Sequence, residues 1–179
     1  RLVSTWLSPQ TAVMSQSVPP PKLTKTKQTQ VVGAAQVRAQ MQHWLQTCVI
    51  GWNLCPFAAP VVQAGGLRVV VSAARTAPTA VRDTLQAAMD LLAKPPQLPA
   101  TTLVVVPHGL ADFGAFLDVV HTVESLLEQA GANGVLQLAH FHPQYVFGDE
   151  PADDPAHATN RAPFPTLHLL RHADIAAVA

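Results

Sequence analysis

The sequence has little charge of either sign. Lys and Arg together number 11, and Asp and Glu also number 11, so the formal net charge is zero. Charged residues make up 12% of the chain, about half of the roughly 25% that is usual in globular domains. Nucleic-acid-binding proteins need a basic surface that neutralises phosphates. The composition therefore argues against a nucleic-acid partner.

Long hydrophobic runs and cysteines are scarce as well. The clearest apolar runs, such as residues 103–106, fall far short of the roughly 18 residues that cross a bilayer. The two cysteines, Cys48 and Cys55, make no disulfide framework, and no secretory hydrophobic segment is evident. These features predict a soluble protein of a reducing compartment, the cytoplasm, without a membrane partner.

Residues 1–30 lack acidic side chains and contain a run of three prolines among many Ser, Thr and Gln. Such a segment buries too little apolar surface to offset its ordering entropy. The sequence predicts a disordered leader over residues 1–30 and a single α/β domain over residues 31–179. Met14 offers an internal start, so part of the leader could be non-native. An acid-free leader is also typical of targeting peptides, which leaves a plastid or another organelle as the alternative location.

Hydrophobic spacing predicts the elements of this domain. Apolar residues recur at helical spacing over residues 36–50, 78–92 and 113–127, and apolar runs over residues 67–72, 101–106 and 134–141 predict strands. A further strand over residues 166–170 is expected at a sheet edge, because Pro163 and Pro165 precede it. The fold class is therefore α/β: a small two-layer or three-layer domain with a mainly parallel sheet of three to four strands and three helices.

Histidines follow two of the predicted strands, at the edge where ligands bind in open parallel sheets. His108 follows the second strand, and His140 and His142 close the third. Two residues apart in an extended segment, His140 and His142 point to one face and could bind a divalent metal such as zinc, with Asp153 as the third ligand. The alternative is a pair of independently hydrogen-bonded histidines.

The proline-rich connection over residues 144–165 is long for a compact domain, which favours a functional role. Asp154 is a candidate general base, and Asn160 and Arg161 are candidates for holding a carboxylate or phosphate. The alternative is an exposed acidic loop whose Asn160 and Arg161 cap backbone groups. His168, on the fourth predicted strand, is either a core histidine or a further substrate-binding residue.

Cys55 lies in a Cys-Pro-Phe sequence that resembles the sites of glutaredoxin-like proteins and omega-class glutathione transferases. Here the tripeptide follows a helix instead of the first strand of a thioredoxin fold, and no second cysteine lies two residues on. Cys55 is therefore either a nucleophile working with a histidine such as His108 or a packed structural thiol.

Five ordered motifs together resemble the domain of unknown function 1415 family, an uncharacterised and mainly bacterial family. The motifs are residues 51–58, 101–108, 140–147, 153–155 and 159–171. The resemblance covers about residues 36–175 and implies no activity, because the family name assigns none.

The candidate residues favour a small enzyme with a His/Asp/Arg pocket at the strand carboxyl ends. It would act on an anionic small molecule, with or without help from a metal. Two alternatives stay open: a non-catalytic binding module for an anionic metabolite or partner, and a thiol redox protein based on Cys55. The low charge and high apolar content also leave a homodimer open.

Overall fold

A computed structural model describes residues 32–95, 100–151 and 153–176 of the chain. The prediction for residues 1–30 lies outside the described residues. The elements in chain order are α1 (Ala34–Trp44), the π-helix η1 (Leu45–Ile50), α2 (Ala58–Gln63), β1 (Leu67–Val71), α3 (Ala77–Leu92), β2 (Thr101–Val105), α4 (Phe113–Gln129), β3 (Leu136–Phe141), the 3-10 helix η2 (Pro155–Asn160), β4 (Thr166–Arg171) and α5 (His172–Ala176).

The four strands form one mixed sheet in the order β1-β2-β4-β3. β1 and β2 pair in parallel, whereas β4 is antiparallel to both β2 and β3. The predicted α/β class is confirmed. The predicted mainly parallel sheet is wrong, and so is the predicted edge position of β4. Pro163 and Pro165 precede the first residue of β4, so no ladder N–H is lost. The carbonyl of Pro165 even accepts a hydrogen bond from Val106 N–H at 2.9 Å.

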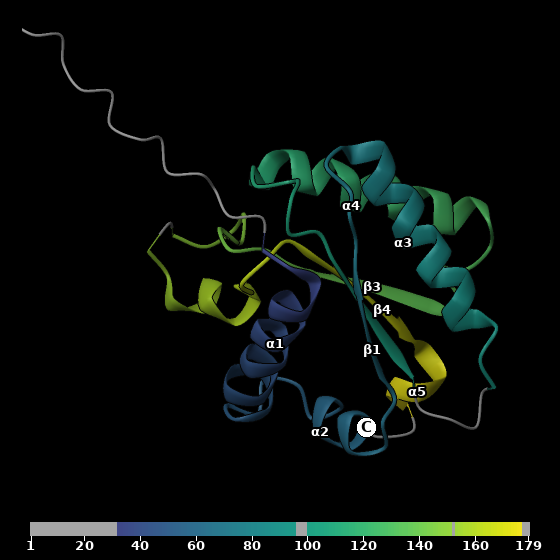
Figure 1. Ribbon diagram of the computed structural model, residues 1–179, viewed down its shortest axis with the longest axis horizontal. Helices are drawn as coiled ribbons and strands as arrows, with labels where there is room; N and C mark the ends of the chain where they lie inside the picture. Colours follow the sequence, from purple (N-terminus) through teal and green to yellow (C-terminus); the bar gives the residue numbers. More distant parts are fainter. Residues whose placement is uncertain (1–31, 96–99, 152, 177–179) are drawn as a thin grey trace, which may run out of the picture. The chain divides into compact units, whose positions relative to one another are not determined.

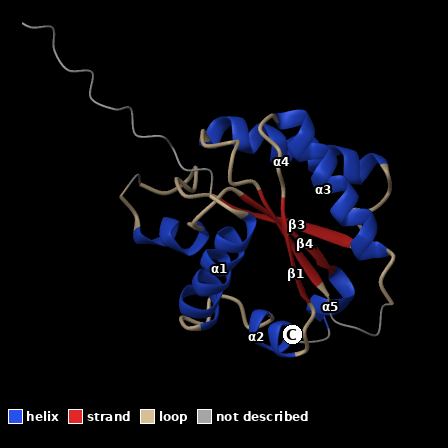
Figure 2. Ribbon diagram, viewed as in Figure 1, coloured by secondary structure: helices blue, strands red, loops and turns tan. Residues whose placement is uncertain are grey.

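Helices cover both faces of the sheet (Figures 1 and 2). One face packs Leu167 and Leu169 of β4 into a core with α3 and α4. On the other face, Leu170 packs against Phe57 and Val61 near α2, and Leu103 of β2 packs with α1 and η1. Successive β4 side chains therefore alternate between two cores, which places His168 on the face that α1, η1 and α2 cover.

The three predicted helices are present, with additions. The first divides into α1 and η1, and the third is capped by Asp112, whose Oδ1 accepts a hydrogen bond from Ala115 N–H at 2.8 Å. α2, η2 and α5 were missed because five or six residues are too few to show an apolar period. In the described part of the chain, no helix is both long and apolar enough to span a membrane.

A buried ion pair holds the short helix α5. Arg171 Nε donates to Asp174 Oδ2 at 2.6 Å, and both side chains are almost fully buried. Asp174 also accepts from Ala100 N–H at 3.0 Å, and Arg171 donates to the carbonyl of Lys94 at 3.2 Å. These bonds join α5 to the segments that follow α3 and precede β2. They matter for function because Ile175, next to Asp174, lines a cavity described below.

Candidate functional site

Three predicted site residues, His140, His142 and Asn160, lie at the end of β3 together with Tyr145 and His157, which the sequence did not single out. We call these five residues the strand-end cluster. The rings of His140 and His142 both lie against Phe116 of α4, with centroid distances of 6.1 and 5.1 Å. The expectation that the two histidines point to one face is therefore confirmed.

His142 is fully buried and uses both ring nitrogens. Gln144 N–H donates to Nδ1 at 3.1 Å, so Nε2 carries the hydrogen and donates to the carbonyl of Leu110 at 2.9 Å. An imidazole whose two nitrogens both take part in hydrogen bonds has no lone pair left for a metal. In this arrangement His142 is a structural residue.

His157 repeats this pattern in the long connection. It is fully buried, accepts from Phe147 N–H through Nδ1 at 3.1 Å, and its Nε2 lies 2.7 Å from the carbonyl of Pro151. Asp154 accepts from Ala156 N–H at 2.7 Å and so caps η2. The polar side chains of His157 and Asp154 thus form hydrogen bonds with backbone groups of the same loop.

The rest of the cluster is less tightly bonded. His140 Nε2 lies 3.4 Å from the hydroxyl of Tyr145, and Asn160 Nδ2 donates to the carbonyl of His140 at 3.4 Å. Burial lowers the pKa of His140 and raises the pKa of Tyr145, because desolvation disfavours each charged form. Arg161 donates through Nε to the carbonyl of Tyr145 at 3.2 Å, while its side chain is exposed.

The residues predicted to hold a metal do not converge. Asp153 is exposed, and both nitrogens of His142 are occupied. Within residues 32–95, 100–151 and 153–176, no group of three or more His, Cys, Asp or Glu side chains is placed to hold a metal ion. His108 is partly buried in the turn after β2, and its ring has no hydrogen-bond partner among the described residues. Zinc binding therefore stays a prediction, and the described residues do not form a site for the metal.

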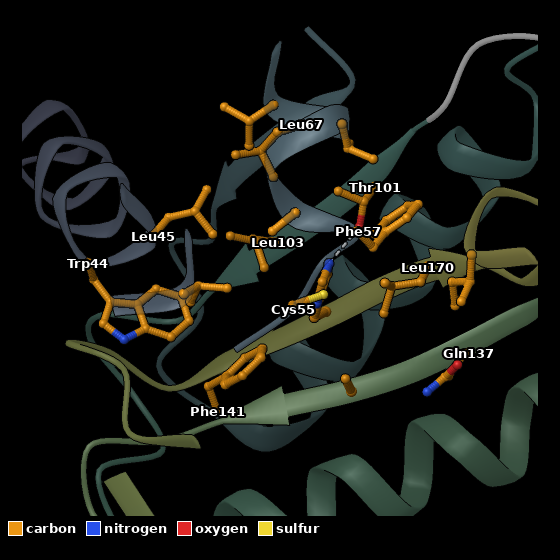
Figure 3. A pocket seen from close by; sticks show the side chains of 17 residues that line it. Trp44, Leu45, Cys55, Phe57, Leu67, Thr101, Leu103, Gln137, Phe141 and Leu170 are labelled. Carbon is orange, nitrogen blue, oxygen red and sulfur yellow. Dashed lines mark hydrogen bonds between the residues drawn. The ribbon is translucent and has the colours of Figure 1, made fainter. Parts of the chain in front are cut away.

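A cavity of about 270 Å³ lies on the opposite face of the sheet, and we call it the face cavity (Figure 3). Its walls come from α1, η1 and α2, and the strands form its floor. Apolar side chains such as Trp44, Phe57 and Phe141 make most of the lining. Among the described residues, the polar ones that line the cavity are Cys55, Thr101, Gln137 and His168, and none of the lining residues is Asp, Glu, Lys or Arg.

His168 pairs with Thr101 in this cavity. Its Nε2 lies 2.5 Å from Thr101 Oγ1, and that hydroxyl donates to the carbonyl of Leu169 at 2.9 Å. Burial lowers the pKa of His168 to about 4, so the ring is neutral near pH 7. The structure thus assigns His168, which the sequence left between core and site, to the lining of a cavity.

Cys55 lies in the loop that joins η1 to α2 and points into the same cavity (Figure 3). Gly51 allows the chain to enter this loop, because a Cβ at that position would collide with the carbonyl oxygen of Thr47. Among the described residues, no hydrogen bond joins the Cys55 thiol to His168. Cys55 and Cys48 are both free thiols. His108 does not line the face cavity, so Cys55 and His108 do not share this site.

The cavity itself was missed by reasoning from the sequence, together with Thr101 as the partner of His168. One signal was present: a lone histidine alternates with leucines on a strand whose other face is apolar. A second signal is that residues 39–67, which supply the cavity walls, contain no Asp, Glu, Lys or Arg. Uncharged surface over so long a stretch is typical of a lining or an interface.

Comparison with known proteins identifies the family of the domain but no activity. A family model described as "Protein of unknown function (DUF1415)" matches residues 36–179. No curated protein and no solved structure matches the chain significantly.

Proposed function

The chain belongs to the DUF1415 family, and we propose that it binds a small, uncharged and largely apolar molecule in the face cavity. The observation that supports this proposal most directly is a hollow of about 270 Å³ with an uncharged lining. An apolar cavity of about 150 Å³ is already large enough to take up benzene.

The cavity also has the features of a small-molecule site. Ligand pockets are mostly apolar, with a few polar groups that orient the ligand, and here Cys55 and His168 occupy that role. The π-helix η1 contributes Leu45 and Val49 to the wall, and such irregular turns occur frequently at functional sites. Because none of the described lining residues carries a charge at neutral pH, an ion would lose its hydration there without compensation.

Titration with indene, an uncharged bicyclic hydrocarbon, tests the proposal. Ala139 on β3 lines the cavity, so Ala139→Leu fills the space that the ligand needs. We expect the wild type to bind indene in isothermal titration calorimetry and Ala139→Leu to weaken binding at least tenfold. Ala115→Leu, an exposed position on α4, is the matched control and should bind as the wild type does. Equal affinity in the wild type and Ala139→Leu would overturn the proposal.

An enzyme that acts on an anionic molecule at the strand carboxyl ends is a second candidate, with or without a divalent metal. The exposed guanidinium of Arg161 favours it, because within the described residues its one hydrogen bond runs from Nε to the carbonyl of Tyr145 at 3.2 Å. Inorganic phosphate is a suitable probe. Its binding should be lost in Arg161→Ala and kept in Ala139→Leu, and binding that is insensitive to Arg161→Ala would remove this candidate.

The proposal includes a cytoplasmic location, since the free thiols Cys48 and Cys55 suit a reducing compartment. Fractionation of cells that make the full chain distinguishes this location from an organelle.

A further inference from the structure

The hydroxyl of Thr101 defines the tautomer of His168. A threonine hydroxyl has one hydrogen and two lone pairs. Thr101 Oγ1 donates that hydrogen to the carbonyl of Leu169, which as a carbonyl can only accept. Its 2.5 Å contact with His168 Nε2 is therefore a hydrogen bond only if Nε2 carries a hydrogen and donates it. The neutral ring then holds its hydrogen on Nε2 and a lone pair on Nδ1.

The lone pair on Nδ1 has no partner among the described residues. It is not sealed inside the protein either. The ring of His168 is only partly buried and lines the face cavity. Among the described residues, the fully buried side-chain nitrogen or oxygen without a hydrogen-bond partner is Thr102 Oγ1, so Nδ1 of His168 is not fully buried. His168 therefore presents a hydrogen-bond acceptor, and no donor, to the cavity.

We infer that the ligand of the face cavity is a neutral, compact apolar molecule with one N–H or O–H group, which donates a hydrogen bond to Nδ1 of His168. This inference rests on the proposed function and names its ligand class. An alcohol, a phenol or an indole-type N–H has the required chemistry. An ammonium group does not, because the described lining residues include no carboxylate to pair with it.

The donor requirement is tested by comparing indole with indene. The two molecules have nearly the same size and shape, but only indole has an N–H group. We expect the wild type to bind indole about fivefold more tightly than indene, as one neutral hydrogen bond provides. His168→Phe removes the acceptor and should bind both compounds with equal affinity in calorimetry.

Thr101→Val provides a second variant that leaves the imidazole in place. It removes the group that keeps the hydrogen on Nε2, so the ring can place the hydrogen on Nδ1, and the preference for indole should fall below twofold. This variant decides the question if His168→Phe fails to fold.

Three outcomes would contradict the inference. Equal binding of indole and indene by the wild type overturns the donor requirement and leaves the proposed function standing. A preference for indole that survives both substitutions overturns the role of His168. Failure of the wild type to bind either compound overturns the proposed function itself, and the inference with it.

Discussion

The strand-end cluster and the face cavity both contain histidine, but they differ in how its nitrogens are bonded. In the cluster, His142 and His157 each accept a backbone N–H and donate to a backbone carbonyl. In the cavity, His168 donates to Thr101, and its other ring nitrogen has no hydrogen-bond partner in the part of the chain that the structure describes. The cluster therefore uses its histidines to hold loops in place, whereas the cavity offers a group that a ligand can engage.

The difference shows that the number of polar residues in a segment is a weak guide to function. A loop that runs across a buried edge must pair its own backbone groups, and His, Asp and Asn side chains are suited to that task. The more informative observation is a polar group whose bonding is incomplete inside an apolar lining. His168 meets that condition and His142 does not.

The largest expected effect comes from removing the anchor of α5. Asp174 is buried and accepts hydrogen bonds from Arg171 and Ala100 N–H. Breaking a buried ion pair typically costs 3–5 kcal/mol, so Asp174→Ala should lower the free energy of unfolding by about 4 kcal/mol in urea denaturation. Because Ile175 lines the cavity, indene binding should weaken as well. The exposed Asp118→Ala is the control, and a loss below 1 kcal/mol for Asp174→Ala would contradict this role.

The next effect tests whether the cluster is structural. His142→Ala leaves Gln144 N–H and the carbonyl of Leu110 without partners and creates a cavity beside Phe116. We expect a loss of about 3 kcal/mol, equal with and without a chelator, while the exposed His43→Ala stays within about 0.5 kcal/mol. A loss that appears only when metal is present would assign His142 to a metal site instead.

The pH dependence of stability tests whether His168 is buried in the face cavity as a neutral ring. Burial holds the pKa of His168 near 4, below its ordinary value of 6.5. Between these values the unfolded chain binds a proton that the folded chain does not, so stability falls as pH falls through this window. From pH 7 to pH 5 this amounts to about 2 kcal/mol, measured by urea denaturation at each pH.

His168→Leu should remove most of that slope. His140, whose pKa burial also lowers, accounts for a residual slope of the same sign. An unchanged slope in His168→Leu would show that His168 is not the group that titrates.

The smallest effect concerns the two thiols. Cys55 lines the face cavity, and Cys48 does not. A ligand in the cavity should shield Cys55, so saturating indole should slow iodoacetamide alkylation of Cys55 severalfold and leave Cys48 unchanged, as followed by peptide mass spectrometry. Equal protection of both thiols would place the ligand elsewhere.

The fold could be predicted where local patterns decide it. The spacing of apolar residues, together with the glycines and prolines that bound each segment, predicts the three longest helices and the four strands. The pairing of β4 could not be predicted, because it depends on contacts between distant segments, such as Val105 with Thr166. Pro163 and Pro165 predict an edge strand, but both lie before β4 begins at Thr166, so neither removes a ladder hydrogen bond.

The candidate site could be predicted only in part, for a related reason. The period of two correctly placed His140 and His142 on one face. The partner of His142 Nε2 is the carbonyl of Leu110, 32 residues away, and no local pattern reveals such a bond. The face cavity depends on where α2 docks against the sheet. Because α2 has only six residues, its sequence shows too short an apolar pattern to predict where the helix docks.

The most direct measurement is an NMR titration of isotope-labelled protein with indole, followed through the backbone amides. We predict that shifts concentrate at the cavity, at Cys55, Ala139 and Leu170, while the amides of Gln144 and Phe147 in or beside the strand-end cluster stay in place. Shifts at Gln144 and Phe147 with none at the cavity would contradict the assignment of the binding site.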